Sequence, residues 1–177
     1  MEQVNGRIAT LQVGVPTHHP TSVPANGVKT WQTSFFRTPS ATPRWLFTTH
    51  LDGNEQADKE NHGQWNQAML LYAAAHYPLW QSELDLPVIG PGGFGENVTV
   101  EGQSEATVCL GDRYAIGAAI IQITGPRYPC WKNAQRWGVA DLLERIKANG
   151  RTGWYCSVER EGMLAPGDAI TLLERPY

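Results

Sequence analysis

The chain has 177 residues, enough to bury one hydrophobic core, and we expect a single domain over residues 1–177. Hydrophobic residues make up 41% of the sequence and charged residues 18%, a balance that excludes an intrinsically disordered chain. The net charge of −3 provides no bulk attraction to nucleic acid or to an anionic membrane. No apolar run reaches the ~20 residues of a membrane-spanning helix, and the polar first ten residues lack the apolar core of a secretory signal. We therefore expect a cytoplasmic protein that binds neither nucleic acid nor a membrane.

Short β-forming runs separated by Gly, Pro and Asp are the main secondary-structure signal. They predict strands over residues 6–13, 28–36, 97–101, 114–124, 154–159 and 169–174. The turns Gly111-Asp112 and Gly167-Asp168 precede two of these runs, and Gly117 predicts a bulge or bend within the fourth. This pattern favours a mainly β protein built on a closed or nearly closed barrel.

Apolar residues at helical spacing predict two helices. The first is expected over residues 64–76 and ended by Pro78, and the second over residues 139–149 with Gly150 as its cap. Residues 16–26 are polar and contain proline, so a loop is expected there.

The three cysteines are Cys109, Cys130 and Cys156, an odd number with no C-x-x-C spacing. Neither a disulfide framework nor a structural zinc site is indicated, and reduced thiols are expected. Cys109 and Cys156 each lie in an apolar run, so we expect both to pack in the core.

The segment around Cys130 is the first candidate for chemistry. Two prolines stiffen the backbone there, and Arg127 and Lys132 lie within three residues of the thiol. Nearby positive charge favours the thiolate, which is a better metal ligand and nucleophile than the thiol. Because the segment follows a predicted strand, Cys130 should project from a rigid strand end. The alternative is an inert, buried cysteine.

Residues 90–97, Gly-Pro-Gly-Gly-Phe-Gly-Glu-Asn, formally contain G-x-G-x-x-G. A strand follows this loop where the dinucleotide-binding motif requires a helix, so a Rossmann fold is excluded. The loop can still present backbone N–H groups to a cofactor phosphate, or it can be a plain turn.

Two further polar groups are candidates for binding. Residues 50–63 could bind a metal through His50, Asp52, Glu55, Asp58 and His62, but their spacing matches no standard zinc signature and also suits a solvated loop. A set of four basic residues could bind a phosphate if the barrel brings their loops together. Otherwise these residues are scattered surface charges. That basic set is Arg37, Arg127, Lys132 and Arg151.

Taken in order, five segments resemble the MOSC domain, named for the C-terminal domain of molybdenum cofactor sulfurases. They are residues 93–97, 111–112, 126–130, 150–155 and 162–168, and the resemblance extends over residues 6–176. Residues 56–63 and those after them resemble the stand-alone bacterial subgroup linked to resistance to N-hydroxylated base analogues. Where many relatives continue His-Gly with Gly-Pro-Asp, this chain has Gln64, Trp65 and Asn66.

The resemblance implies a barrel similar to that of the pyruvate-kinase barrel domain and a site for a molybdenum cofactor of the molybdopterin type. Cys130 is expected to be the catalytic residue, either ligating molybdenum or carrying sulfur. The motif positions assign Arg37, His62, Asn97 and Arg127 to cofactor binding. The glycine loop and the basic set add Gly93, Lys132 and Arg151 to that group.

Three functions are compatible with this sequence. The first is a molybdenum-dependent reductase of N-hydroxylated compounds. Because no flavin or NAD motif is present, it would need an external flavin or iron–sulfur protein as electron donor. The second is a non-catalytic carrier of the cofactor, or of sulfur as a Cys130 persulfide. The third is a barrel that serves only as an interaction module.

Overall fold

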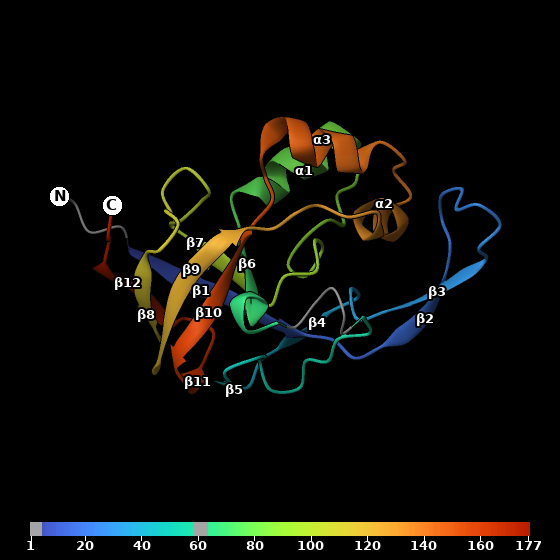
Figure 1. The fold of residues 1–177 in the computed structure, drawn as a ribbon. Coiled ribbons are helices and arrows are strands. Elements are labelled where there is room, and N and C mark those ends of the chain that lie inside the picture. Colours follow the sequence, from blue (N-terminus) through green and yellow to red (C-terminus); the bar gives the residue numbers. More distant parts are fainter. Residues whose placement is uncertain (1–4, 59–63) are drawn as a thin grey trace.

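The computed structural model describes residues 5–58 and 64–177. Its barrel strands are β1 (Asn5–Val13), β6 (Met69–Ala73), β7 (Val98–Glu101), β8 (Arg113–Ile116), β9 (Ala119–Pro126), β10 (Trp154–Arg160) and β12 (Ala169–Glu174). They close in the order β12, β8, β9, β10, β6, β7 and β1, because β1 pairs with both β7 and β12 (Figure 1). β6 and β7 are parallel, and the other neighbours around the barrel are antiparallel. The predicted closed, mainly β barrel is confirmed.

Strand β6 is buried along its whole length and separates two hydrophobic clusters. Side chains alternate between the faces of a strand, so Met69, Leu71 and Ala73 pack in the barrel core. Tyr72 points the other way, into the second cluster. The strand is therefore covered on both faces, which is unusual for an antiparallel barrel and typical of a parallel pair.

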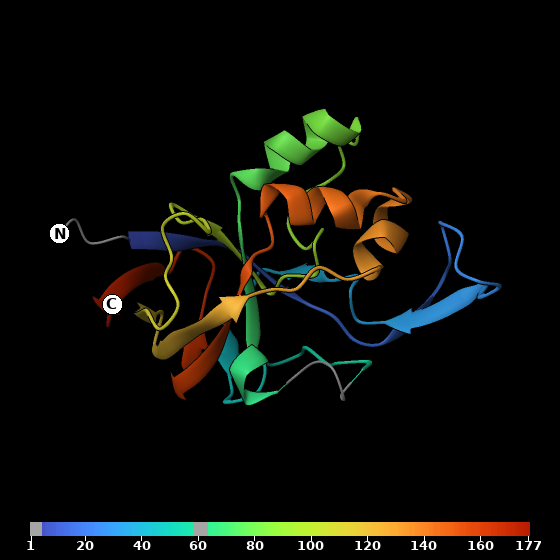
Figure 2. The same ribbon diagram turned by 45° about the horizontal axis from the view of Figure 1, so that its top comes forward.

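Three short helices cover one side of the barrel in both views (Figures 1 and 2). They are α1 (His76–Leu84), α2 (Lys132–Trp137) and α3 (Leu142–Asn149). The second cluster fills the space beneath them and consists of Tyr72, Tyr77, Trp80, Ile89, Phe94, Leu142 and Ile146. None of the helices in residues 5–58 and 64–177 is long and apolar enough to cross a membrane.

The remaining elements lie outside the barrel. β2 (Thr17–Pro20) and β3 (Thr30–Thr33) form a hairpin that extends away from the barrel beyond α2 (Figure 2). β4 (Thr38–Ser40) adds to the edge of β1, and β5 (Arg44–Leu46) pairs with β11 (Gly162–Leu164). A short 3-10 helix, η1 (Trp65–Gln67), leads into β6.

The strand predictions are largely confirmed, but one predicted strand forms two strands. The run at residues 114–124 forms β8 and β9 as a hairpin, with Gly117 at the turn and a φ of +53°. A Cβ at Gly117 would lie 2.5 Å from an Asp168 carboxylate oxygen, so only glycine fits the turn. In the Gly-Asp turns, Asp112 accepts from the Cys109 amide and Asp168 from the Ala165 amide, which closes both turns in the same way.

The helix predicted over residues 64–76 is wrong. This segment forms η1, β6 and the start of α1. A strand that is buried on both faces has a continuous apolar run, which periodicity alone cannot distinguish from a buried helix. Pro78 lies in the first turn of α1, where its missing N–H costs no hydrogen bond. The second helix is confirmed as α3, capped by the Gly150 N–H on the Ile146 carbonyl at 3.0 Å.

One of the two cysteines expected in the core is there. Cys156 is fully buried in the barrel, and burial raises the pKa of its thiol to about 12. The prediction for Cys109 is wrong, because this residue is exposed in the turn before β8.

Candidate functional site

Cys130 lies between the end of β9 and the start of α2, and its side chain is half-buried. The Arg127 Nη2 atom donates to Cys130 Sγ at 3.6 Å. The backbone N–H and the Nδ2 atom of Asn133 both donate to the Cys130 carbonyl, at 3.2 and 3.1 Å, so the first turn of α2 fixes the cysteine backbone. A partly exposed thiol against a guanidinium is the setting in which reactive and metal-binding cysteines occur.

Arg127 connects the thiol to the glycine loop. Its side chain is only 6% exposed, and its Nη1 atom donates to the Phe94 carbonyl at 2.8 Å. Its backbone N–H donates to the Gly153 carbonyl at 3.0 Å, which fixes the chain where it leaves β9. The guanidinium carbon lies 5.4 Å from the centre of the Phe35 ring. Arg127 is therefore a rigid, buried cation beside Cys130.

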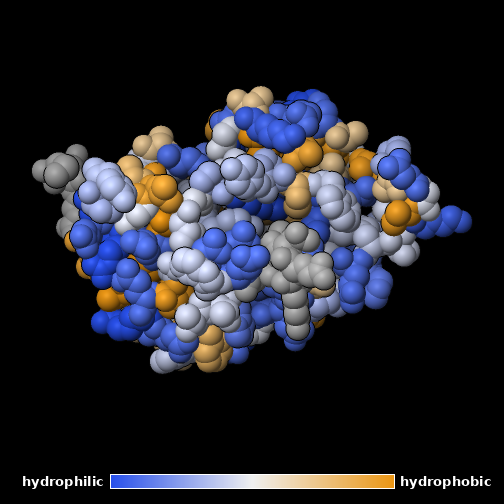
Figure 3. Space-filling view, viewed as in Figure 1, coloured by the Kyte–Doolittle hydropathy of each residue, from blue (hydrophilic) through white to orange (hydrophobic). Residues whose placement is uncertain are grey.

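A cleft open to solvent adjoins these two residues and includes about 520 Å³ of space between its walls and at its mouth. Its lining residues are Thr33, Ser34, Phe35, Arg37, Gln56, Ala57, Gln67, Leu70, Gly95, Asn97, Arg127, Cys130, Lys132 and Tyr155. Five of the predicted site residues thus converge: Arg37, Asn97, Arg127, Cys130 and Lys132. In Figure 3, hydrophilic residues dominate the surface between the helices and the barrel.

Arg37 is the residue lining the cleft whose pKa is shifted most by its surroundings. Its Nε and Nη1 atoms are buried and have no hydrogen-bond partner among the residues that the structure describes, although the rest of the side chain is partly exposed. Burial lowers the pKa of the guanidinium to about 10; Glu96 opposes this effect and the charge of Arg127 adds to it. A buried donor without a partner is costly. Two guanidiniums in one cleft, one of them unpartnered, favour an anionic ligand.

Asn97 lines the cleft and also connects three strands. Its Oδ1 atom accepts from the Leu70 N–H at 3.2 Å, and its Nδ2 atom donates to the Gln12 carbonyl at 3.4 Å. The Asn97 N–H donates to the Leu70 carbonyl at 2.8 Å. The side-chain amide therefore holds β1, β6 and the start of β7 together at the cleft floor.

The N–H groups of the glycine loop are used within the loop. Glu96, fully buried, accepts from the backbone amides of Gly92 and Phe94 at 2.6 and 3.1 Å. The amides of Gly93 and Gly95 donate to backbone carbonyls three residues earlier. This is the plain-turn arrangement and not a row of amides open to a phosphate. Gly93 does not line the cleft; its carbonyl accepts from Trp137 Nε1 at 2.8 Å.

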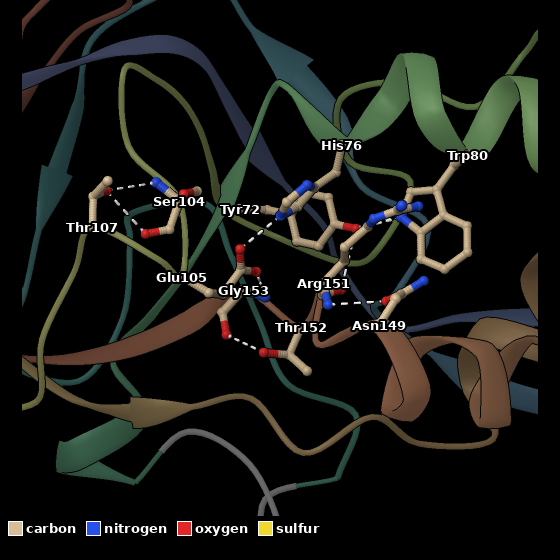
Figure 4. Close-up of polar contacts among 10 residues, drawn as sticks. All are labelled: Tyr72, His76, Trp80, Ser104, Glu105, Thr107, Asn149, Arg151, Thr152 and Gly153. Atoms are coloured by element: carbon tan, nitrogen blue, oxygen red, sulfur yellow. Dashed lines mark hydrogen bonds and ion pairs between the residues drawn. The ribbon is translucent and has the colours of Figure 1, made fainter.

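Arg151 lies beside Trp80 and Asn149, as Figure 4 shows. Its guanidinium pairs with Glu83 at 2.8 Å and lies 4.9 Å from the ring centre of Trp80 on α1. The adjacent network joins His76 Nε2 to Glu105 Oε2 at 2.6 Å, and Glu105 Oε1 accepts from a backbone amide. The basic set is therefore divided, and Arg151 does not line the cleft.

His62 lies outside the described residues. No group of three or more His, Cys, Asp or Glu residues that could hold a metal ion is present in residues 5–58 and 64–177. Sequence reasoning missed several lining residues, among them Phe35, Gln67 and Tyr155. They come from separate segments; Tyr155 lies in the 150–155 segment of the family resemblance, but no motif assigned it to the cleft.

The chain matches the model of the MOSC domain over residues 58–171, more than half of its length. It belongs to the MOSC domain family. The protein YflK of Bacillus subtilis (strain 168) is 34% identical over 175 residues, which cover 99% of this chain and 76% of YflK. The crystal structure of YiiM from Geobacillus stearothermophilus has a TM-score of 0.76 and 31% identity, over 96% of this chain and 76% of that one.

Two further relatives are longer. Protein YiiM of Escherichia coli (strain K12) is 33% identical over 128 residues, which cover 71% of this chain and 57% of YiiM. A protein of Gibberella moniliformis (strain M3125 / FGSC 7600) named "Reductase" is 35% identical over 138 residues, covering 76% of this chain and 24% of that protein. This MOSC chain therefore spans about a quarter of the fungal protein and just over half of the E. coli one.

MOSC domains are associated with the molybdenum cofactor, and the residues of the cleft fit such a group. Cys130 offers a soft sulfur ligand at the cleft wall. The unpartnered donors of Arg37, with Arg127 and Lys132, suit a phosphate. The cleft thus offers donors for an anion next to a thiol.

Proposed function

We propose that this MOSC protein binds a molybdenum–pterin cofactor in the cleft at Cys130 and reduces N-hydroxylated compounds. The observation that carries the proposal is the position of the Cys130 thiol beside Arg127, in one cleft with Arg37, whose Nε and Nη1 atoms have no hydrogen-bond partner among the described residues. A thiol alone would fit many roles, but a thiol that shares its cleft with Arg37, Arg127 and Lys132 suits an anionic metal cofactor. The fungal relative named a reductase is compatible with redox chemistry.

Different residues would bind different parts of the cofactor. Cys130 would supply the one protein ligand to molybdenum. Arg37, Arg127 and Lys132 would hold the pterin phosphate through charge-assisted hydrogen bonds. Asn97 and Arg127 position the cleft through their backbone contacts and are fixed before any ligand arrives.

When bound, the cofactor would supply two-electron redox chemistry. In the reaction as a whole, the N–O bond of R–NHOH breaks, two electrons and two protons are taken up, and R–NH2 and water are formed. The electrons would come from a separate flavin or iron–sulfur protein, because the sequence has no motif for either flavin or NAD. We place this reaction in the cytoplasm, where such donors and reduced thiols are found.

The first experiment measures molybdenum by elemental mass spectrometry in protein purified anaerobically from a host that makes the cofactor. Wild type is compared with Cys130→Ser, and Cys109→Ser is the matched control because its thiol is exposed outside the cleft. We expect near-stoichiometric molybdenum in wild type and in the control, and loss of most of it in Cys130→Ser. Equal molybdenum in all three would refute the ligand role and favour a sulfur carrier.

The second experiment tests turnover. Loaded protein with a chemical reductant should convert hydroxylamine and N-hydroxylated bases to the corresponding amines. Protein that contains molybdenum but never turns over would contradict the reductase function and leave the carrier function. Protein that never contains molybdenum would contradict both cofactor-dependent functions.

A further inference from the structure

Two backbone carbonyls on different segments hold Arg127. Its N–H donates to the Gly153 carbonyl at 3.0 Å, and its Nη1 atom donates to the Phe94 carbonyl at 2.8 Å. The amides of these same two residues each donate to a glutamate. The Gly153 N–H donates to Glu105 Oε1 at 2.7 Å, and the Phe94 N–H donates to Glu96 Oε2 at 3.1 Å. Both segments that hold Arg127 are therefore fixed by a carboxylate.

The two carboxylates are in turn bound by adjacent residues at the start of α1. His76 Nε2 lies 2.6 Å from Glu105 Oε2, and the Tyr77 hydroxyl donates to Glu96 Oε1. His76 and Tyr77 are the first two residues of α1. Figure 4 shows the His76 ring directed at the Glu105 carboxylate. One helix turn therefore reaches the two segments that hold Arg127 through two separate carboxylates.

The protonation states suit these contacts. Burial tends to raise the pKa of Glu105, but hydrogen bonds, led by the one from His76, lower it below its usual value. An ionised carboxylate only accepts hydrogen bonds, so His76 Nε2 is the donor. Burial, followed by the charge of Glu96, raises the pKa of Tyr77 well above its usual range, so its hydroxyl stays protonated and donates. Hydrogen bonds to a carboxylate are stronger than those between neutral groups, and both α1 contacts are of this kind.

The end point of both paths is a guanidinium at the cleft. Arg127 lines the cleft and donates to Cys130 Sγ at 3.6 Å. Among the residues that the structure describes, the lining set includes neither His76 nor Tyr77, so any effect of these two residues on the cleft passes through the residues between. A long side chain that is fixed before a ligand arrives loses less entropy when the ligand binds. The two paths thus have a use at the site beyond holding α1 on the barrel.

We propose that the first turn of α1 positions Arg127 beside Cys130, and that His76 and Tyr77 are positioning residues acting through the two glutamates. His76 fixes the Arg127 backbone through Glu105, and Tyr77 fixes its guanidinium through Glu96. The inference rests on the proposed function for what Arg127 does to a bound group, whereas the positioning itself rests on the hydrogen bonds. Neither His76 nor Tyr77 belongs to the cysteine segment, the glycine loop or the basic set.

The test follows each path separately by NMR of the cofactor-free protein. His76→Phe keeps a ring and removes the donor, so hydrogen exchange at the Gly153 and Arg127 amides should become about tenfold faster. The Ile8 amide, which donates to a carbonyl outside both paths, should be unaffected. His76→Gln retains an N–H donor and should restore slow exchange. Tyr77→Phe should instead lower the heteronuclear NOE of the Arg127 Nε–H group, which reports a more mobile guanidinium, and leave the Gly153 amide unchanged.

The matched control for Tyr77→Phe is Tyr114→Phe. It also removes a buried tyrosine hydroxyl that donates to a carboxylate, here Asp112 at 2.9 Å. A merely structural role predicts that both tyrosine variants alter the NOE of Arg127 alike, or that His76→Phe speeds exchange at Ile8 as much as at Gly153. Either result, or no change at Arg127 in any variant, would overturn the proposal. Tyr77→Phe removes a single oxygen atom and tests the second path even if His76→Phe does not fold.

A binding measurement connects the positioning to the cleft. Calorimetric titration with pyrophosphate should give a Kd about tenfold higher for the double variant His76→Phe, Tyr77→Phe than for wild type, and little change for Tyr114→Phe. Unchanged affinity in the double variant would overturn the role of the two paths at the site. A wild type that does not bind pyrophosphate would count against the phosphate site of the proposed function, while the exchange and NOE measurements would still decide the positioning.

Discussion

Arg37→Met should stabilise the cofactor-free protein while it removes anion binding. Burial lowers the pKa of Arg37 from its usual value to about 10, which corresponds to about 3 kcal/mol against the charged form. Because the folded pKa lies below the unfolded value, this penalty is fully present below pH 10 and decreases as the pH rises above it. Methionine keeps most of the aliphatic stem and removes the charge and both unpartnered nitrogens.

We expect about 1–2 kcal/mol of added stability at pH 7, because part of the recovered energy is offset by imperfect packing of the new side chain. For a chain of this size, that corresponds to a rise in Tm of about 2–8 °C. Urea and thermal unfolding of the cofactor-free protein measure it. Millimolar pyrophosphate should then raise the Tm of wild type and not that of Arg37→Met. Arg145→Met, which removes an exposed arginine paired with Asp141, is the control and should change stability by less than about 0.5 kcal/mol.

Two results would refute this reasoning. A variant less stable than wild type by a similar margin would show that Arg37 is satisfied in the folded protein. A wild type whose Tm does not respond to pyrophosphate would show that the unpartnered guanidinium does not mark an anion site.

Three further outcomes are expected. Because burial raises the pKa of the Cys156 thiol to about 12, a thiol reagent should label two cysteines in the native protein and the third only in urea. Burial tends to raise the pKa of Asp112, but hydrogen bonds, led by the one from Arg175, lower it below 3.8. The stability that ionised Asp112 contributes to the fold is therefore present above pH 3.8 and is lost as the pH falls below that value. Asp112→Asn should therefore cost about 1–3 kcal/mol in urea unfolding at pH 7 and much less at pH 2.5. Gly153→Ala should lower the Tm by several degrees, because φ is +72° and the new Cβ would lie 2.5 Å from a backbone carbonyl of β6.

The sequence predicted those parts of the fold whose signals are local. The Gly-Asp turns could be placed because glycine allows the positive φ and the aspartate closes the turn onto its own backbone. β6 could not be placed, because its burial depends on a parallel neighbour and a helical layer that come from distant parts of the chain. β2 was missed because its polar sequence resembles a loop, whereas β3 lies within the strand predicted over residues 28–36.

At the candidate site too, local contacts could be predicted from the sequence and contacts between distant segments could not. Arg127 and Cys130 are three residues apart, so their contact follows from the motif itself. The family resemblance assigned Arg37 to the site, and Arg37 lines the cleft, but the exclusion of Arg151 could not be predicted because it is decided by packing. Arg151 lies over Trp80 on α1, whereas Arg37 enters the cleft from the segment after β3.

The pairing register of the barrel strands determines which residues form the floor of the cleft. Tyr155 lies opposite Leu70 on β6 and opposite Gly125 on β9, and Asn97 is hydrogen-bonded to the same Leu70 through its backbone and side chain. Three lining residues are thus neighbours in one ladder. A slip of one residue would turn Tyr155 to the opposite face of the sheet and separate it from Leu70 and Asn97. The site is therefore part of the barrel pairing itself, and the cysteine segment continues from β9 with the Arg127 N–H hydrogen-bonded to the Gly153 carbonyl.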